Sequence, residues 1–305
     1  YSATTTALLY LDGVVYLPIC EEMRKRLDAF EVDGIEDGGM IEYLTRKKKE
    51  GRFPVYQTTE RPDRAAQAIL EGRVVLLTDN SPEALIFPAT LNSLFQTADD
   101  YYRNERIVTF LRLIRYVAAF LALALPGLYV AAATFHPQLL PGNLIRSMAE
   151  ARSGVPFPTA AEVLLMELSF ELLREAGLRM PGPAGNTIGI VGGLIVGQAA
   201  VSANLVSPIT VTVAALTALG SFSIPNEELS EVFRLWKYGI LLLGSCFGIL
   251  GVMLGCFLLL MLMAEQESYG IPWLYPYVGG NLNERADEKD SMFLAAARKR
   301  KRRPI

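Results

Sequence analysis

The feature that most constrains this sequence is a series of long apolar runs between Ile107 and Ala264. Uncharged hydrophobic stretches of roughly 20 residues are long enough to cross a bilayer as helices. The residues up to Tyr102 instead have the mixed composition of a water-soluble domain, and those from Gln266 onward become polar and finally basic. The chain is therefore predicted to join a soluble N-terminal part to an integral membrane part.

The soluble part, at residues 1–100, is predicted to be an α/β domain. Strand-like runs such as TTTALLYLDGVV and RVVLLTDNSPEALIFPA alternate with helical patterns such as CEEMRKRLDAFEV. This alternation is typical of α/β folds. The chain opens with Tyr1 directly in a strand-like run, so we expect a partial domain that is truncated at its N-terminus.

The membrane part, at residues 101–265, is predicted to be an α-helical multi-pass domain with an amphipathic helix at 159–177. About four spans are expected, at residues 116–135, 187–203, 209–222 and 236–264. The last run is longer than one straight crossing needs, and its Gly-xxx-Gly pairs fit either a tilted helix or a helix–helix contact face. Residues that favour bends are hinge candidates: Pro126, Gly127, Pro181 and Gly185.

Charge predicts the orientation of the chain. The tail at residues 266–305 ends in ARKRKRRPI, and arginines also precede the first span. By the positive-inside rule, both ends then lie on the cytoplasmic side, which requires an even number of crossings. Four apolar spans satisfy this condition if the helix at 159–177 does not cross. Beside a membrane, the basic tail favours contact with anionic lipid over nucleic acid.

The charged helix has two kinds of glutamate. Thr159 and Glu162 form a capping-box pattern, so Glu162 is expected to bond back to the start of the helix. Glu167, Glu171 and Glu175 instead recur every fourth residue and form one stripe. Arg174 lies on nearly the same face. These last four residues are the pore or gate candidates.

Three interpretations of this helix are open. It could lie in the membrane interface, pack outside the membrane on other spans, or turn its stripe toward a water-filled path in an oligomer. Rings of carboxylates favour cations in channels. Two further polar residues near membrane depth, Gln198 and Asn204, most often form interhelical hydrogen bonds, and a substrate contact is the alternative.

The residues predict neither an enzyme nor a metal or cofactor site. The apolar runs contain no paired-Asp motif, no Ser/His pair and no HExxH, so an intramembrane protease is not expected. The single histidine, His136, has no neighbouring ligand set, and three cysteines are too few for a disulfide framework.

Several sequence motifs resemble those of one protein family, and they occur along this chain in the same order as in that family. LLYLDGVV, TERPD, AILEGRVVLLTDNSPEALIFP, DDYY, PGLYVA, ELSFELLREAGLRMPGPAGNTIGIVGGLIVGQAAVSANLVSP and YGIPWLYPY are similar to the GerA-type spore germination proteins, the A subunits of nutrient germinant receptors. The tail departs from the family, because AAARKRK replaces a more usual proline- and aromatic-bearing stretch.

The resemblance implies a multi-pass protein of the spore inner membrane, with its N-terminal domain and tail on the core side. It also implies a transporter-like B subunit and a lipoprotein C subunit as partners. Family members are expected to form homo-oligomers that act as ligand-gated cation channels, without catalysis or cofactor. Two rivals stay open on the residues alone: a secondary transporter of a small solute, and a structural scaffold subunit.

Overall fold

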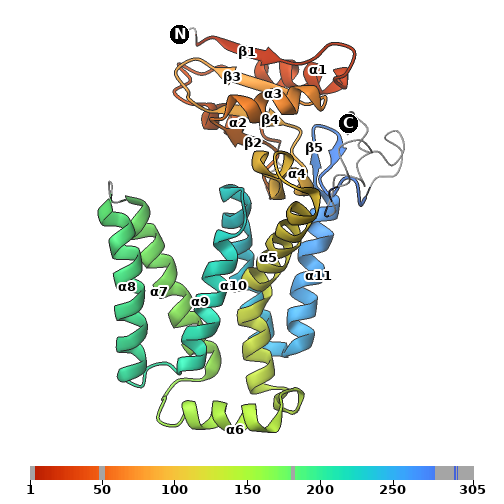
Figure 1. The fold of residues 1–305 in the computed structure, drawn as a ribbon. Helices are drawn as coiled ribbons and strands as arrows, with labels where there is room; N and C mark the ends of the chain where they lie inside the picture. The colour runs from red at the N-terminus through yellow and green to blue at the C-terminus, as the bar shows by residue number, and fades with distance from the viewer. Residues whose placement is uncertain (1–3, 48–51, 180–182, 279–291, 293, 295–305) are drawn as a thin grey trace. The chain divides into compact units, whose positions relative to one another are not determined.

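The computed structural model (Figure 1) describes residues 4–47, 52–179, 183–278, 292 and 294. The chain divides into two compact units. The first comprises Tyr1–Tyr116, Pro225–Val232 and Leu260–Ile305, and the second comprises Val117–Ile224 and Phe233–Leu259. Segments from both ends of the sequence therefore belong to the first unit.

The first unit contains a four-stranded sheet in the order β1-β3-β4-β2. Its strands are β1 (Thr6–Leu9), β2 (Gln57–Thr59), β3 (Val74–Thr78) and β4 (Ala84–Phe87). The small N-terminal sheet is confirmed, but every pairing is antiparallel, which corrects the predicted α/β class to α+β. The reason is local: β3 turns directly into β4 around Asn80, whose φ is 67°.

Apolar side chains cover both faces of this sheet. Val74 and Leu76 pack on one face against α1 (Leu17–Leu27) and α2 (Gly38–Thr45). On the other face, Val75 contacts α3 (Pro62–Leu70). Successive strand residues point to opposite faces, so a strand covered on both sides has the nearly continuous apolar sequence VVLL. Two short helices follow the sheet, α4 (Leu91–Phe95) and η2 (Ala98–Tyr101).

The segment after the last helix also packs into the first unit. It forms a small hairpin of β5 (Glu267–Ser268) and β6 (Ile271–Pro272). Tyr269 joins the core on the α1 face of the sheet. Trp273 is fully buried, and its Nε1 donates a hydrogen bond of 2.8 Å to the carbonyl oxygen of Pro54. These residues were predicted only as the start of a basic tail, yet they complete the core of the N-terminal sheet.

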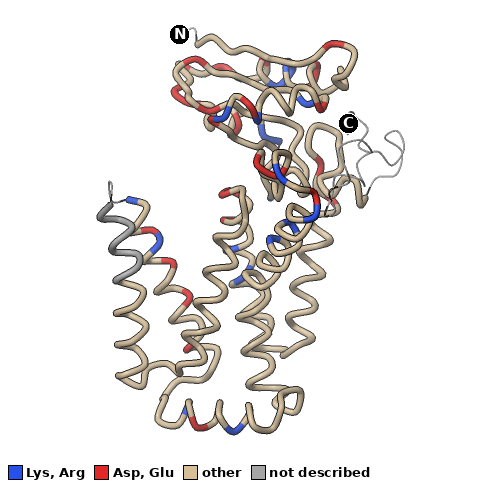
Figure 2. The backbone as a smooth tube through the Cα atoms, viewed as in Figure 1, with Lys and Arg blue, Asp and Glu red and all other residues tan. Residues whose placement is uncertain are grey.

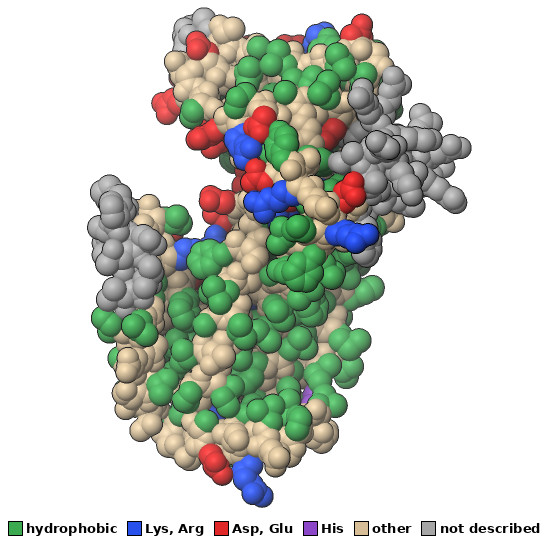
Figure 3. Space-filling view, viewed as in Figure 1, with side chains coloured by type: hydrophobic (Ala, Val, Ile, Leu, Met, Phe, Trp, Pro, Cys, Tyr) green, Lys and Arg blue, Asp and Glu red, His purple; other side chains and the backbone are tan. Residues whose placement is uncertain are grey.

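The second unit is helical, and three of its helices also contribute residues to the first unit. Figure 3 shows hydrophobic side chains spread over the visible face of these helices. The elements in chain order are α5 (Glu105–Thr134), η3 (Pro137–Leu139), α6 (Gly142–Ala151), α7 (Thr159–Arg179), α8 (Pro183–Ser202), α9 (Pro208–Phe222), α10 (Glu227–Phe247) and α11 (Ile249–Glu265).

The last apolar run is divided in the structure. We expected one span at 236–264, but α10 ends before Gly248, which has a φ of 63°, and α11 begins after it. A Cβ on Gly244 would lie 2.9 Å from Val252, and one on Gly255 would lie 2.9 Å from Ile240. The two helices therefore fold back on each other, and glycine allows the backbones to come this close.

Two helical stretches are long and apolar enough to cross a membrane. They are Glu105–Thr134, with a mean hydropathy of 1.9, and the run Glu227–Glu265, with 2.6, which the bend at Gly248 divides into α10 and α11. The described part of α8 from Gly192 and the 15-residue helix α9 are apolar but shorter. The number and bounds of the four expected spans stay predictions.

Candidate functional site

Helix α7 presents one face to the core of the second unit. Its Val163 packs with Val130 and Leu241, and its Met166 packs with Val206 and Ala214. These contacts hold α7 against α5, α9 and α10, and they fix the direction in which its charged residues point. Figure 2 shows the charged positions along the backbone.

Glu162 does not have the role expected from the capping-box pattern. Its side chain is fully buried and accepts hydrogen bonds from the Ser207 backbone N–H at 2.9 Å and from the Thr210 hydroxyl at 3.1 Å. Arg152 pairs with its other oxygen. Glu162 thus caps the start of α9 rather than that of its own helix, because a carboxylate is favoured at a helix N-terminus.

Glu167 forms a buried ion pair with Lys237, a residue outside the predicted candidates. The Nζ of Lys237 in α10 lies 2.6 Å from Glu167 Oε2, and the two side chains are 4% and 2% exposed. In a buried pair of this kind, the attraction between the two charges offsets the free energy that is needed to remove each of them from water.

Glu171, one turn along α7, forms a second and more exposed ion pair. It pairs with Arg234, which lies three residues before Lys237 on α10. Residues three apart share a helix face, so the sequence FRLWK already placed two cations on one side of α10. This spacing was the available signal, but it could not show which helix the cations would meet.

Arg174 and Glu175 form no ion pair with the described residues of α10. The guanidinium of Arg174 lies over the Phe222 ring at 4.3 Å from its centre, a cation–π contact. Glu175 is exposed and pairs with Arg179 of the same helix at 2.6 Å. The structure therefore brings Glu167, Glu171 and Arg174 together and leaves Glu175 on the surface.

A cavity of about 600 Å³ lies beside these charges. Phe170 and Leu173 of α7 and Ala218 and Phe222 of α9 give it apolar walls. Its charged lining residues are Glu167, Glu171, Arg174, Arg234 and Lys237. A mostly apolar cavity with a few polar groups is the usual form of a small-molecule site.

The other candidate residues lie away from this cavity. Gln198 in α8 and Asn204 after it are exposed, and their side chains make no hydrogen bond within the described residues. Pro126 lies inside α5, which continues through it without a break. A Cβ on Gly127 would lie 3.2 Å from Ile240, so this glycine serves close packing.

The remaining two hinge candidates flank the start of α8. Gly185 lies in the first turn of α8 and not in the loop where it was expected. Pro181 falls outside the described residues. The roles proposed for these residues therefore stay predictions.

The first unit contains a second buried charge cluster at the DDYY motif. Asp100, 2% exposed, pairs with Arg112 at 3.2 Å and with Arg115 at 2.7 Å. Burial alone would raise the pKa of Asp100, but the charge and hydrogen bonds of Arg115 and the bonds from Thr97 lower it below the usual aspartate value. These arginines, expected to be cytoplasmic-side charges, hold the start of α5 against η2.

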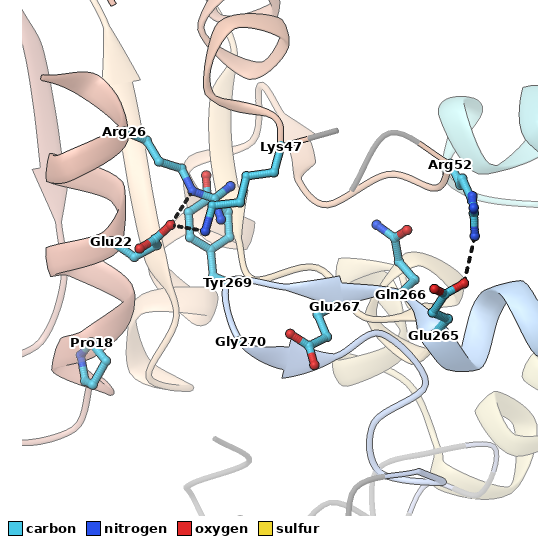
Figure 4. A pocket seen from close by; sticks show the side chains of 10 residues that line it. All are labelled: Pro18, Glu22, Arg26, Lys47, Arg52, Glu265, Gln266, Glu267, Tyr269 and Gly270. Atoms are coloured by element: carbon cyan, nitrogen blue, oxygen red, sulfur yellow. Dashed lines mark hydrogen bonds and ion pairs between the residues drawn. The ribbon is translucent and has the colours of Figure 1, made fainter. Parts of the chain in front are cut away.

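A polar cavity of about 530 Å³ lies in the first unit (Figure 4). Glu22 of α1 forms ion pairs with Lys47 at 2.5 Å and with Arg26 at 2.9 Å. The hydrogen bonds and charges of these two cations lower the pKa of Glu22 below its usual value. The Arg26 guanidinium also lies over the ring of Tyr269, at 4.2 Å. Arg52 pairs with Glu265 at the end of α11.

The chemistry available at all three charged clusters, around Glu167, Asp100 and Glu22, is ion pairing. Among the described residues, no group of three or more His, Cys, Asp or Glu side chains is placed to hold a metal ion. Glu167 and Glu171 of α7 meet a lysine and an arginine of α10. The site therefore has the properties of a charged contact between helices.

Comparison with known proteins gives the chain a family context. All residues, 1–305, match the family described as Bacillus/Clostridium GerA spore germination protein. No solved structure matches the chain.

Individual relatives agree with this match. The chain is 39% identical over 293 residues to the uncharacterized membrane protein YfkQ of Bacillus subtilis (strain 168), covering 96% of this chain and 56% of the relative. It is 39% identical over 270 residues to spore germination protein A1 of the same organism, covering 88% and 56%. With spore germination protein GerLA of Bacillus cereus the identity is 38% over 275 residues, covering 90% and 56%. The chain spans about half the length of these relatives.

Proposed function

Because this chain belongs to the GerA family of spore germination proteins, we propose that it is the A subunit of a nutrient germinant receptor. It acts in the spore inner membrane as a multi-pass protein, with its N-terminal domain and tail on the core side. A transporter-like B subunit and a lipoprotein C subunit are its partners. The family match over the whole chain is the observation that supports this proposal.

The mechanism that we propose is signalling through helix movement, without catalysis. A nutrient bound by a partner subunit favours one of two conformations of an oligomer of this chain. In the open conformation, α7 borders a path for monovalent cations. The apolar stretches Glu105–Thr134 and Glu227–Glu265 support the membrane location.

The ion pairs of α7 suggest what distinguishes the two conformations. With Glu167 held by Lys237 and Glu171 held by Arg234, these two carboxylates are neutralised within the chain and attract few cations. Moving α7 away from α10 would free both carboxylates, and the stripe would then favour cations as acidic rings do. In this proposal, the arrangement with both ion pairs formed is the closed state.

The test is to record cation current from the reconstituted receptor after changing Glu167, Glu171 and Glu175 together to glutamine. We expect a loss of cation selectivity, because the stripe would no longer carry charge. A matched control is Glu150→Gln on α6, an exposed glutamate outside the stripe.

Unchanged current and selectivity in an assembled triple variant would remove the pore from the proposal. Solute uptake by this subunit alone would indicate a transporter instead. A protein that stays monomeric after gentle detergent extraction has no oligomeric path to line, which would also contradict the channel.

A further inference from the structure

The cavity between α7, α9 and α10 is not balanced in charge. Its lining contains three cationic side chains, Arg174, Arg234 and Lys237, and two anionic ones, Glu167 and Glu171. Subtracting two from three leaves one positive charge. Two of the cations have carboxylate partners, while Arg174 makes no ion pair within the described residues and only stacks on Phe222.

One oxygen in the same cavity lacks a hydrogen-bond donor. Glu167 is 2% exposed, and its Oε1 has no hydrogen-bond partner in the described structure, although Oε2 binds Lys237. The Thr217 hydroxyl lies near this carboxylate and donates a hydrogen bond to the Val213 carbonyl at 2.9 Å. Buried carboxylate oxygens are costly to leave unpaired, so a donor from outside the chain is expected here.

Apolar surface continues outward from the charged part of the cavity. Three of its lining residues are strongly exposed: Leu178 at 73%, Phe222 at 68% and Leu219 at 62%. Such side chains suit hydrocarbon rather than water. A ligand that fits the whole cavity therefore needs one negative charge, at least one hydroxyl or similar donor, and an apolar portion.

We propose that this cavity binds the headgroup of an anionic phospholipid that carries hydroxyl groups, of the phosphatidylglycerol type. The phosphodiester binds the Arg174 guanidinium, a headgroup hydroxyl donates to Glu167 Oε1, and the acyl chains lie on Leu219 and Phe222. Glu167 and Arg174 are seven residues apart, about 10 Å along the helix, which a glycerol phosphate and the two side chains can span. Basic pockets between membrane helices bind anionic lipid headgroups in this way.

This inference rests on the proposed membrane location of the second unit. The two can be separated experimentally by washing membranes with alkaline carbonate before any lipid is tested. Release of the chain by the wash would contradict the membrane location and with it the proposed function. If the chain is retained, the membrane location stands, and the lipid experiment below then tests the lipid inference separately.

The experiment is native mass spectrometry of the full chain in detergent with added phosphatidylglycerol or phosphatidylcholine. We expect phosphatidylglycerol to be retained, and Arg174→Gln to lower its bound fraction several-fold. Arg174→Lys, which keeps the charge, should restore part of the binding. The matched control is Arg179→Gln on the same helix, an exposed arginine paired with Glu175, which should retain the lipid as the original chain does.

A second variant keeps the test valid if Arg174→Gln fails to fold. Ala218→Phe adds bulk to the cavity wall without changing charge, and it should also reduce retention. Equal retention of the two lipids by the original chain would overturn the proposal. So would full displacement by soluble glycerol phosphate, which indicates a free phosphate ligand, or cross-links that show a second copy of the chain covering Phe222.

Discussion

At the scale of single residues, the pair of Glu167 and Lys237 makes the sharpest prediction. Lys237→Met leaves a buried carboxylate without its counter-charge, and we expect the free energy of unfolding to fall by about 3 kcal/mol. Thermal unfolding of the detergent-solubilised chain measures this. The double variant Glu167→Gln, Lys237→Met should recover most of the loss, because it removes both charges.

The control for that prediction is Glu175→Gln, which breaks an exposed pair on the same helix. Exposed pairs contribute about 0–1 kcal/mol. If Glu175→Gln lowered the free energy of unfolding as much as Lys237→Met, burial would not explain the contribution of the pair of Glu167 and Lys237 to stability.

Asp100 predicts a dependence on pH in the first unit. Its pKa is lowered on folding, so its contribution to stability is present above the unfolded pKa of about 4 and is lost as pH falls through the folded value. The Asp100→Asn variant should be less stable than the original chain at pH 7. Below about pH 4 the difference in stability between the two proteins should become smaller, because Asp100 itself becomes protonated. Unfolding of the full chain followed from pH 7 to pH 2 would reveal it, and parallel curves for the two proteins would contradict it.

At the scale of helices and strands, the α10–α11 hairpin predicts opposite effects for two glycines. A Cβ on Gly251 would overlap the Leu243 carbonyl oxygen, whereas one on Gly239 would meet nothing within 4 Å. Gly251→Ala should therefore destabilise the hairpin. Gly239→Ala should be neutral or stabilising by up to about 1 kcal/mol, because alanine favours helices. Equal thermal stability of the two variants would contradict the close packing.

The elements differ in how far the sequence could predict them. The amphipathic helix was expected to start at Thr159, and α7 starts there, because the preceding prolines and Thr159 are local signals. The break at Gly248 was missed, since one more glycine in a glycine-rich run carries no distinct pattern. The antiparallel sheet was also missed, because the alternation of helices and strands does not specify strand direction.

The sequence could predict the glutamates of the candidate site but not the cations that pair with them. The spacing of Glu167 and Glu171 on α7 is a property of one helix and can be read from the sequence. Their partners, Arg234 and Lys237, lie more than 60 residues away. Pairing them requires the packing of α7 on α10, which depends on the whole helical unit. Glu162 shows the same limit, because its local capping pattern was overridden by tertiary contacts with α9.

At the scale of the whole molecule, the return of the C-terminal segment to the N-terminal sheet predicts a strong effect of truncation. Ending the chain after Glu265 would remove Tyr269, Ile271 and Trp273 from the first unit. We expect residues 4–47 and 52–100 to become sensitive to protease, because the core beneath Tyr56 would be exposed. Limited proteolysis followed by mass spectrometry measures this.

Trp273→Ala is the point-mutation form of the same prediction. Loss of a buried tryptophan costs about 3–5 kcal/mol, and it also leaves the Pro54 carbonyl without its donor. Tyr277→Ala is the control, since Tyr277 is 53% exposed. Resistance of the truncated chain to protease would show that the hairpin is not needed by the sheet.

The same return of the chain has a consequence for synthesis on the ribosome. Strands β1 to β4 emerge early, but the side chains that close their core are translated only after α11. The core of this sheet is therefore completed only after the segment that follows α11 has been made. A chain arrested before Tyr269 therefore lacks side chains that close this core, and its sheet would stay open to protease.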